Sequence, residues 1–163
     1  MSGIDAAVAE RYATARTDSG MFKAGLWVEE VAALAYEAAA DGALTGDDRA
    51  FAQRFAAQER EHAAVFETLL LSLTVPVREH AVPADLERLI PGLRRADRET
   101  ALGRLGELEA AAIAGHQLMG RRLEVLDALR SVAAVMAGGA QHLVVIRAAL
   151  GDEPLTKAFE SGR

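Results

Sequence analysis

Residues 51–70, FAQRFAAQEREHAAVFETLL, place two polar side chains in the middle of an apolar helical stripe. Spacings of three and four residues align one helix face, which carries Phe51, Phe55, Glu59, His62, Phe66 and Leu69. Because an unpaired carboxylate is costly to bury, we expect Glu59 and His62 either to share protons and hydrogen bonds with partners or to bind a cation. Glu-x-x-His is also the pattern with which helical bundles hold carboxylate-bridged metals.

Composition and charge indicate one all-α domain. The 163 residues carry a net charge of −6 and no cysteine, and β-branched residues nowhere alternate with polar ones over a useful length. The lack of cysteine excludes disulfide scaffolds and thiolate metal sites. The acidic balance, without a clustered basic face, argues against nucleic-acid binding. We expect a single domain over residues 1–163, with an N-terminal extension (1–20), a bundle (21–151) and a C-terminal tail (152–163).

Start and stop signals predict one short helix and four long ones, at about 5–15, 21–40, 45–73, 97–122 and 127–151. Residues 17–20, Thr-Asp-Ser-Gly, predict a turn before the first long helix, and Gly42 predicts a left-handed cap at its end. Thr45 and Asp48 resemble a capping box that starts the second long helix. Asp127 is the expected cap of the fourth.

Residues 74–97 contain three prolines, which break helices, and predict a long connection with one helical turn near residues 86–90. At up to ~3.3 Å per residue, this connection can span a bundle about 30 Å long. The links within the two flanking pairs of helices are short. The pattern therefore predicts an antiparallel four-helix bundle with a long crossover connection between helices 2 and 3.

Polar residues interrupt the apolar stripes of the long helices, and an internal repeat relates them. Shifting the numbering by eighty aligns Glu29 with Glu109, Tyr36 with His116, Glu59 with Gly139 and His62 with His142. The two helical hairpins therefore look like one motif used twice, and this register favours Glu29 over its neighbour Glu30 as the residue that faces the core. Glu29 and Glu59 also lie at one height, roughly 17 Å from the turn that joins their helices.

Over about residues 21–160 these features resemble the ferritin-like superfamily. Within it, the chain is similar to bacterial ferritin-like domains whose closing segment reads Gly, Pro, aromatic, here Gly151, Pro154 and Phe159. The resemblance implies two metal ions, usually iron, between one Glu from each of helices 1 and 3 and a Glu-x-x-His from each of helices 2 and 4. Carried over position by position, it names as ligand candidates Glu29, Glu59, His62, Glu109 and His142.

Gly139 departs from this pattern, because it stands where the fourth helix should carry a Glu. The three remaining carboxylates supply −3 against the +4 of two divalent ions. Either an exogenous anion or hydroxide bridges the ions, or one ion binds, or the site has decayed. Tyr36 and His116 are candidates to orient the ligands or to act as redox-active neighbours, and His116 could add a nitrogen ligand. The Gly138-Gly139 pair leaves room for a small substrate, for O₂ or for a closer helix approach.

Two functions follow from these observations. The resemblance implies a metal-dependent redox protein in which iron or manganese, as one or two ions per chain, reacts with O₂ or peroxide and could act on a small-molecule substrate. The alternative is a metal-free bundle that kept the fold and serves as a structural or protein-interaction module, with its acids and imidazoles satisfying one another. Whether the protein is an enzyme depends on which is right.

Two segments bear on where the protein works. Residues 1–10 contain no basic segment followed by an apolar run, so we expect no secretory signal and a cytoplasmic protein. Residues 131–150 are apolar but include Gln141, His142 and Arg147, which favours a buried helix over a membrane span. A homodimer is the base-rate expectation for assembly.

The remaining conspicuous side chains are interpreted as structural. We expect His80, between two prolines, to lie on the surface, and Glu30 and Glu67 to be solvated. Tyr12 and Trp27 are interpreted as packing or interface residues.

Overall fold

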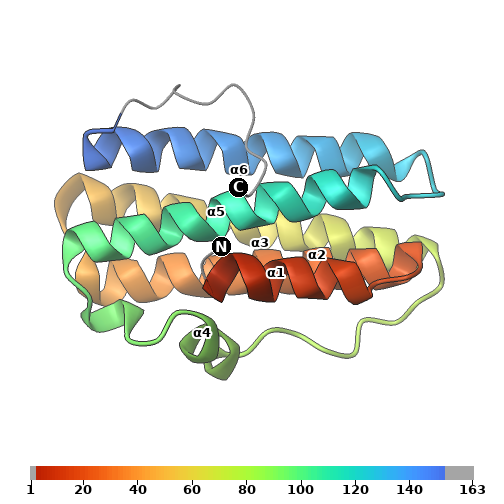
Figure 1. The fold of residues 1–163 in the computed structure, drawn as a ribbon, viewed down its shortest axis with the longest axis horizontal. Coiled ribbons are helices and arrows are strands. Elements are labelled where there is room, and N and C mark those ends of the chain that lie inside the picture. Colours follow the sequence, from red (N-terminus) through yellow and green to blue (C-terminus); the bar gives the residue numbers. More distant parts are fainter. Residues whose placement is uncertain (1–2, 153–163) are drawn as a thin grey trace.

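Four long helices lie side by side in the computed structural model, which describes residues 3–152 (Figure 1). Within that range there are six α-helices, two short helical turns of other types and no strand. The elements are α1 (Gly3–Thr14), α2 (Asp18–Ala38), the π-turn η1 (Ala39–Ala43), α3 (Gly46–Ser72), α4 (Pro83–Leu89), the 3₁₀ turn η2 (Leu93–Arg95), α5 (Arg98–Gly120) and α6 (Ala128–Leu150). The predicted all-α fold is confirmed.

The chain path is that of two helical hairpins joined by a crossover (Figure 1). Helix α2 packs against α3, and α5 against α6, each pair joined by a short link. The crossover runs back along the bundle and carries α4, so α3 and α5 point in the same direction. Helix α1 packs on α5 and α2. The predicted long connection between the second and third long helices is therefore confirmed.

Helix α2 begins earlier than its sequence signals suggested. The backbone of Thr17 is extended, and its hydroxyl accepts a hydrogen bond from the amide of Gly20 at 3.1 Å. Thr17 is thus the N-cap, and the helix starts at Asp18. The predicted turn over residues 17–20 is therefore misplaced: residues 15–17 separate the two helices, and residues 18–20 already belong to α2.

The link between α2 and α3 also differs from the prediction. Gly42 lies in the π-turn without a positive φ, so it is not a left-handed cap. A Cβ at this position would lie 2.0 Å from the carbonyl oxygen of Arg94, so glycine lets the crossover approach closely. Thr45 does occupy the N-cap of α3, but its side chain makes no capping hydrogen bond. Asp48 instead accepts from Nη2 of Arg98 at 3.2 Å, which replaces the expected capping box with a link to α5.

The boundaries of the other elements follow local chemistry. Pro83 stands at the start of α4, and the carboxylate of Asp85 accepts from the amide of Val82 at 2.9 Å, so the crossover helix begins before the predicted turn at 86–90. Asp127 precedes α6 but makes no side-chain capping bond. Gly151 ends α6 in the left-handed conformation with φ 79°, as expected. The rest of the predicted closing segment, including Pro154 and Phe159, lies outside the described residues.

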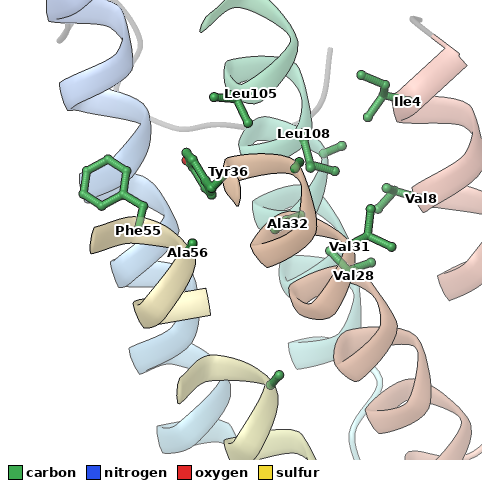
Figure 2. Packing of buried hydrophobic residues seen from close by; sticks show 14 of the residues in the cluster. Ile4, Val8, Val28, Val31, Ala32, Tyr36, Phe55, Ala56, Leu105 and Leu108 are labelled. Atoms are coloured by element: carbon green, nitrogen blue, oxygen red, sulfur yellow. The ribbon is translucent and has the colours of Figure 1, made fainter. Parts of the chain in front are cut away.

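The core runs along the inside of the bundle and extends under α1. Figure 2 shows Ile4 and Val8 of α1 on the side that faces the bundle, near Val28 and Val31 of α2. All four are at most 3% exposed. At roughly 25 cal/mol per Å² of apolar surface removed from water, this burial is what attaches α1 to the bundle.

Helix α6 is long and apolar enough, by length and composition alone, to cross a membrane. In the structure its inner face carries Val132, Val135 and Ile146 into the core, whereas Val144 and Val145 are exposed on its outer face. Residues 131–150 are therefore buried along the inner face only, and the rest of the helix is exposed or partly buried, which differs from the expected buried helix.

Candidate metal centre

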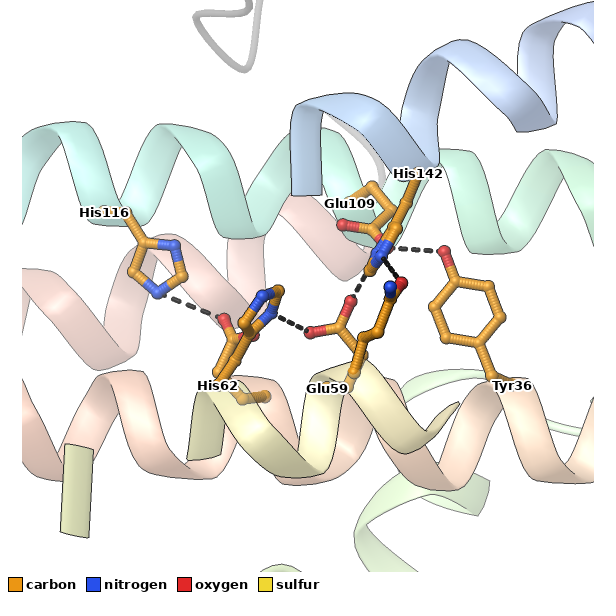
Figure 3. Close-up of polar contacts among 8 residues, drawn as sticks. Tyr36, Glu59, His62, Glu109, His116 and His142 are labelled. Carbon is orange, nitrogen blue, oxygen red and sulfur yellow. Dashed lines mark hydrogen bonds and ion pairs between the residues drawn. The ribbon is translucent and has the colours of Figure 1, made fainter. Parts of the chain in front are cut away.

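Acids, imidazoles and one phenol gather inside the bundle (Figure 3). We call this cluster the Glu/His centre; it consists of Glu29 and Tyr36 of α2, Glu59 and His62 of α3, Glu109 and His116 of α5, and His142 of α6. All but His62 are at most 3% exposed. The structure therefore brings together all five predicted ligands and both predicted neighbours, each from the helix expected to carry it.

Glu59 lies in the middle of the centre and meets one imidazole with each carboxylate oxygen. Its Oε2 is 2.9 Å from Nδ1 of His62, one turn along the same helix. Its Oε1 is 2.7 Å from Nδ1 of His142, on α6. The Glu-x-x-His spacing of α3 thus brings Glu59 and His62 into contact, and Glu59 also contacts His142 on α6.

The half of the centre on the His62 side contains one further acid and one further imidazole. Nδ1 of His62 is 3.2 Å from Oε2 of Glu29. The other oxygen of Glu29, Oε1, is 3.2 Å from Nε2 of His116. The ring of Tyr12, from α1, meets the ring of His116 edge-on with centroids 6.0 Å apart. Buried Tyr12 thus packs as predicted and closes this end of the centre.

The half on the His142 side repeats the arrangement with a phenol at its end. Nδ1 of His142 is 3.0 Å from Oε1 of Glu109, and the Tyr36 hydroxyl donates a hydrogen bond to the same oxygen. Tyr36 therefore contacts Glu109 in the same way that His116 contacts Glu29. The sequence shift of eighty, which aligns Glu29 with Glu109 and Tyr36 with His116, thus relates these two contacts to each other.

Gln58 is a functional candidate that the sequence analysis missed. Nε2 of His142 donates to Oε1 of Gln58 at 2.8 Å, which leaves Nδ1 directed at the two carboxylates. Such a partner fixes the orientation of a ligand imidazole. Gln58 stands directly before Glu59 in the quoted motif, but only the packing of α3 against α6 shows that it contacts His142.

The pKa values of the centre reflect burial around one charged acid. Burial and the nearby Glu59 and Glu109 raise the pKa of Glu29 well above its usual range. Burial, then the charge of Glu59, raises the pKa of Glu109 to about 8. Burial alone would raise the pKa of Glu59 too, but its close contacts with Glu29, His142 and His62 lower the pKa below its usual range. Glu59 is therefore the charged carboxylate of the centre, whereas Glu29 and Glu109 hold protons near neutral pH.

The pKa values of the two buried histidines, His142 and His116, shift in opposite directions. Burial alone would lower the pKa of His142, but Glu109 and Glu59 outweigh it and raise the pKa to about 9. His116 is dominated by burial, which lowers its pKa to about 4. His116 is thus neutral near pH 7, and its buried Nε2, although 3.2 Å from Oε1 of Glu29, makes no hydrogen bond of good geometry among the described residues.

Two groups of ligand atoms in the centre are compact enough to hold an ion. One consists of Glu29, Glu59 and His62, the other of Glu59, Glu109 and His142, with ligand atoms within 4.8 Å of one another in each. Carboxylate oxygen and imidazole nitrogen are ligands that iron and manganese accept. The buried Oε1 of Glu59 lies 2.7 Å from Nδ1 of His142 but makes no hydrogen bond of good geometry within the described part of the chain. The donor set and this unsatisfied atom fit a divalent cation, and Glu59 would belong to both positions.

The two glycines of α6 make room for side chains of the centre. A Cβ at Gly138 would lie 2.6 Å from Cε1 and Nε2 of His62. A Cβ at Gly139 would lie 3.0 Å from Oε2 of Glu109. Of the three uses expected for this pair, the close approach of α6 to its neighbours is the one that these contacts support.

Glu30 belongs to a separate cluster on the surface. Its Oε1 is 2.5 Å from Nδ1 of His80, and its Oε2 accepts from the amide of Ala81 at 2.6 Å. Glu67 lies 4.0 Å from His80, whose side chain is 53% exposed. His80 is on the surface as predicted. Glu30 is not simply solvated, because its contacts with His80 and Ala81 link the crossover to α2. Glu29, and not Glu30, faces the core.

Comparison with known proteins agrees with this arrangement. A family model described as a ferritin-like domain matches residues 17–152, which include every member of the Glu/His centre. Helix α1 precedes the matched range. No curated protein and no solved structure matches the chain significantly.

Proposed function

Because the chain belongs to the family of ferritin-like domains, we propose that it is a metal-dependent redox protein in which iron or manganese at the Glu/His centre reacts with O₂ or peroxide. The observation that carries the proposal is the position of Glu59, shared by two compact groups of ligand atoms. Bound ions of this kind supply one-electron exchange with small oxidants.

The five predicted ligands would form two metal-binding positions. Glu29 and His62 would complete one position, and Glu109 and His142 the other, with Glu59 bridging them. Gln58 and Tyr36 hold the second position in place, because each donates to or accepts from a ligand of that position. Burial keeps bulk water away from the three acids, Tyr36 and His142, whereas Gln58 and His62 lie at the edge of the centre.

Metal binding at this centre is coupled to proton release. The raised pKa values of Glu29, Glu109 and His142 mean that all three hold protons near pH 7 when no ion is bound. A ligand must give up its proton to a metal, so cations compete with protons here. Loss of these protons turns a pocket with one charged acid, Glu59, into one with three carboxylates.

Elemental analysis of the purified protein, given as metal atoms per chain, tests the proposal together with the absorption change when Fe(II) meets O₂. We expect between one and two atoms per chain and an absorption change. A ratio near two would show that Gly139 does not prevent the second position from filling. No bound metal after growth with added iron, and no absorption change, would contradict the proposal.

A second candidate function is the metal-free bundle that acts as a structural or protein-interaction module. It is favoured by the direct contacts among the side chains of the centre, since His62, His142 and Tyr36 lie against the three acids. This alternative predicts a melting temperature that neither a chelator nor added Fe(II) changes.

A further inference from the structure

A surface groove of about 580 Å³ lies between α1, the first part of α2 and the crossover connection. No member of the Glu/His centre lines it. Its lining includes the partly exposed apolar side chains of Trp27 and Val77 and the exposed cations Arg11, Lys23 and Arg78. A groove of this size, with an apolar part and a few convergent polar groups, is typical of small-molecule sites.

The charges of the groove are unbalanced in favour of cations. Arg11, Lys23 and Arg78 make no side-chain ion pair or hydrogen bond with any part of the chain that the structure describes. Of the two acids that line the groove, Asp85 is paired with Arg88, which leaves Glu79 as the unpaired one. Three unpaired cations thus face one unpaired acid, in a chain whose net charge is −6.

Trp27, the one tryptophan of the chain, lines the same groove. The guanidinium carbon of Arg11 lies 3.9 Å from the centroid of its ring. The indole Nε1 is buried and has no hydrogen-bond acceptor among residues 3–152. Buried donors are nearly always satisfied, so this N–H indicates an acceptor that residues 3–152 do not supply.

We propose that the groove binds a soluble organic anion, whose phosphate or carboxylate group is held by Arg11, Lys23 and Arg78 and whose apolar body lies on Trp27 and Val77. Guanidinium groups bind such oxyanions through paired, charge-assisted hydrogen bonds. An oxygen of the same group would also give the indole N–H its missing acceptor. The apolar floor formed by the partly exposed Trp27 and Val77 favours an organic anion over a bare inorganic ion, because covering it removes apolar surface from water.

The fluorescence of Trp27 tests this proposal directly, since no other tryptophan contributes. The full-length protein is titrated with hexyl phosphate and, separately, with inorganic phosphate. We expect a saturable fluorescence change with both, and at least about tenfold tighter binding of hexyl phosphate, because its alkyl chain covers the floor. No saturable change up to about 10 mM hexyl phosphate, or equal affinity for the two probes, would overturn the proposal.

Two substitutions and a matched control locate the binding. Lys23→Gln and Arg78→Gln should each weaken hexyl phosphate binding by about tenfold, because each removes one charge-assisted contact. Arg54→Gln removes an equally exposed arginine on α3, outside the groove, and should leave the affinity unchanged. Equal weakening by Arg54→Gln would show that only the overall charge matters and would overturn the proposal. Binding to phosphatidic acid vesicles without any response to hexyl phosphate would overturn it too, by assigning the cations to a lipid surface.

Discussion

Nδ1 of His142 lies 2.7 Å from Oε1 of Glu59, and this contact joins the last helix of the bundle to α3. It places Glu59 between two imidazoles, since His62 meets its other oxygen. The pattern of the family expects a second central carboxylate at position 139, where this chain has glycine. If the centre binds two ions as proposed, Glu59 would therefore carry alone the bridging role that two acids would otherwise share.

Substitution of single acids should remove ions selectively. Glu29→Gln should empty the position shared with His62, and Glu109→Gln the position shared with His142, whereas Glu59→Gln should empty both because both use it. Metal atoms per chain, measured after identical Fe(II) loading, distinguish these outcomes.

Glu61→Gln provides a matched control, because Glu61 lies on the same helix but is exposed. Its metal content should equal that of the parent protein. If Glu59→Gln and Glu61→Gln retain the same amount of metal, Glu59 does not bridge.

Gln58→Leu should weaken metal binding without removing a ligand. The substitution takes away the acceptor that orients His142 through Nε2, 2.8 Å away. Loss of such a partner reduces metal affinity by about 10-fold to 100-fold. Titration with Mn(II) measures the change, and Gln53→Leu, at an exposed position on the same helix, should leave the affinity as it is. An unchanged affinity for Gln58→Leu would mean that His142 needs no such support.

Gly138→Ala should weaken metal binding more than it destabilises the fold. The new methyl group would overlap the far edge of the His62 ring, at 2.6 Å, and that ring can rotate away toward solvent. Metal affinity should therefore fall while thermal unfolding of the metal-free protein changes little.

Gly103→Ala is the control for the effect of replacing a glycine by alanine within a helix. A Cβ at this position of α5 meets nothing within 4 Å, so the substitution should stabilise the protein by about 0.5–1 kcal/mol and leave metal binding intact. Normal metal binding by Gly138→Ala would contradict the assigned position of His62.

The metal-free protein should lose stability as the pH rises from about 7 to about 9. Burial and neighbouring charge raise the pKa of Glu109 to about 8, and the acids around His142 raise its pKa to about 9 against the effect of burial. Both groups thus keep protons in the folded protein that the unfolded chain has released, so the free energy of unfolding falls as these protons are lost. His116, with a pKa lowered to about 4, does not titrate in this range.

Thermal unfolding in the presence of a chelator, at several pH values across that range, measures this dependence. Glu109→Gln should make the decrease shallower, because it removes one of the titrating groups. Metal affinity should change in the opposite direction and rise with pH, since cations and protons compete for the same atoms. A metal-free protein that becomes more stable over this range would contradict the assigned protonation states.

The fold was largely predictable because its signals are local. The periodicity of apolar residues and the prolines of the connection identify four long helices and a crossover without knowledge of their packing. Gly42 shows where this reasoning stops. Its role depends on the carbonyl of Arg94, from a distant segment that approaches its Cα, and no local pattern contains that contact.

The candidate centre was predictable to a similar extent and for a related reason. Helix geometry gives the height of Glu29 and Glu59, and the internal repeat gives the corresponding residues of the second hairpin. Gln58 was missed because its contact with His142 depends on how α3 and α6 are rotated against each other. Periodicity alone does not specify that rotation.

Anomalous diffraction from crystals of the iron-loaded protein tests the bridging role of Glu59 most directly. We predict two peaks inside the bundle, one against Glu29, Glu59 and His62 and the other against Glu59, Glu109 and His142. Iron found only at the surface cluster of Glu30, Glu67 and His80, or a centre without any peak, would contradict this account.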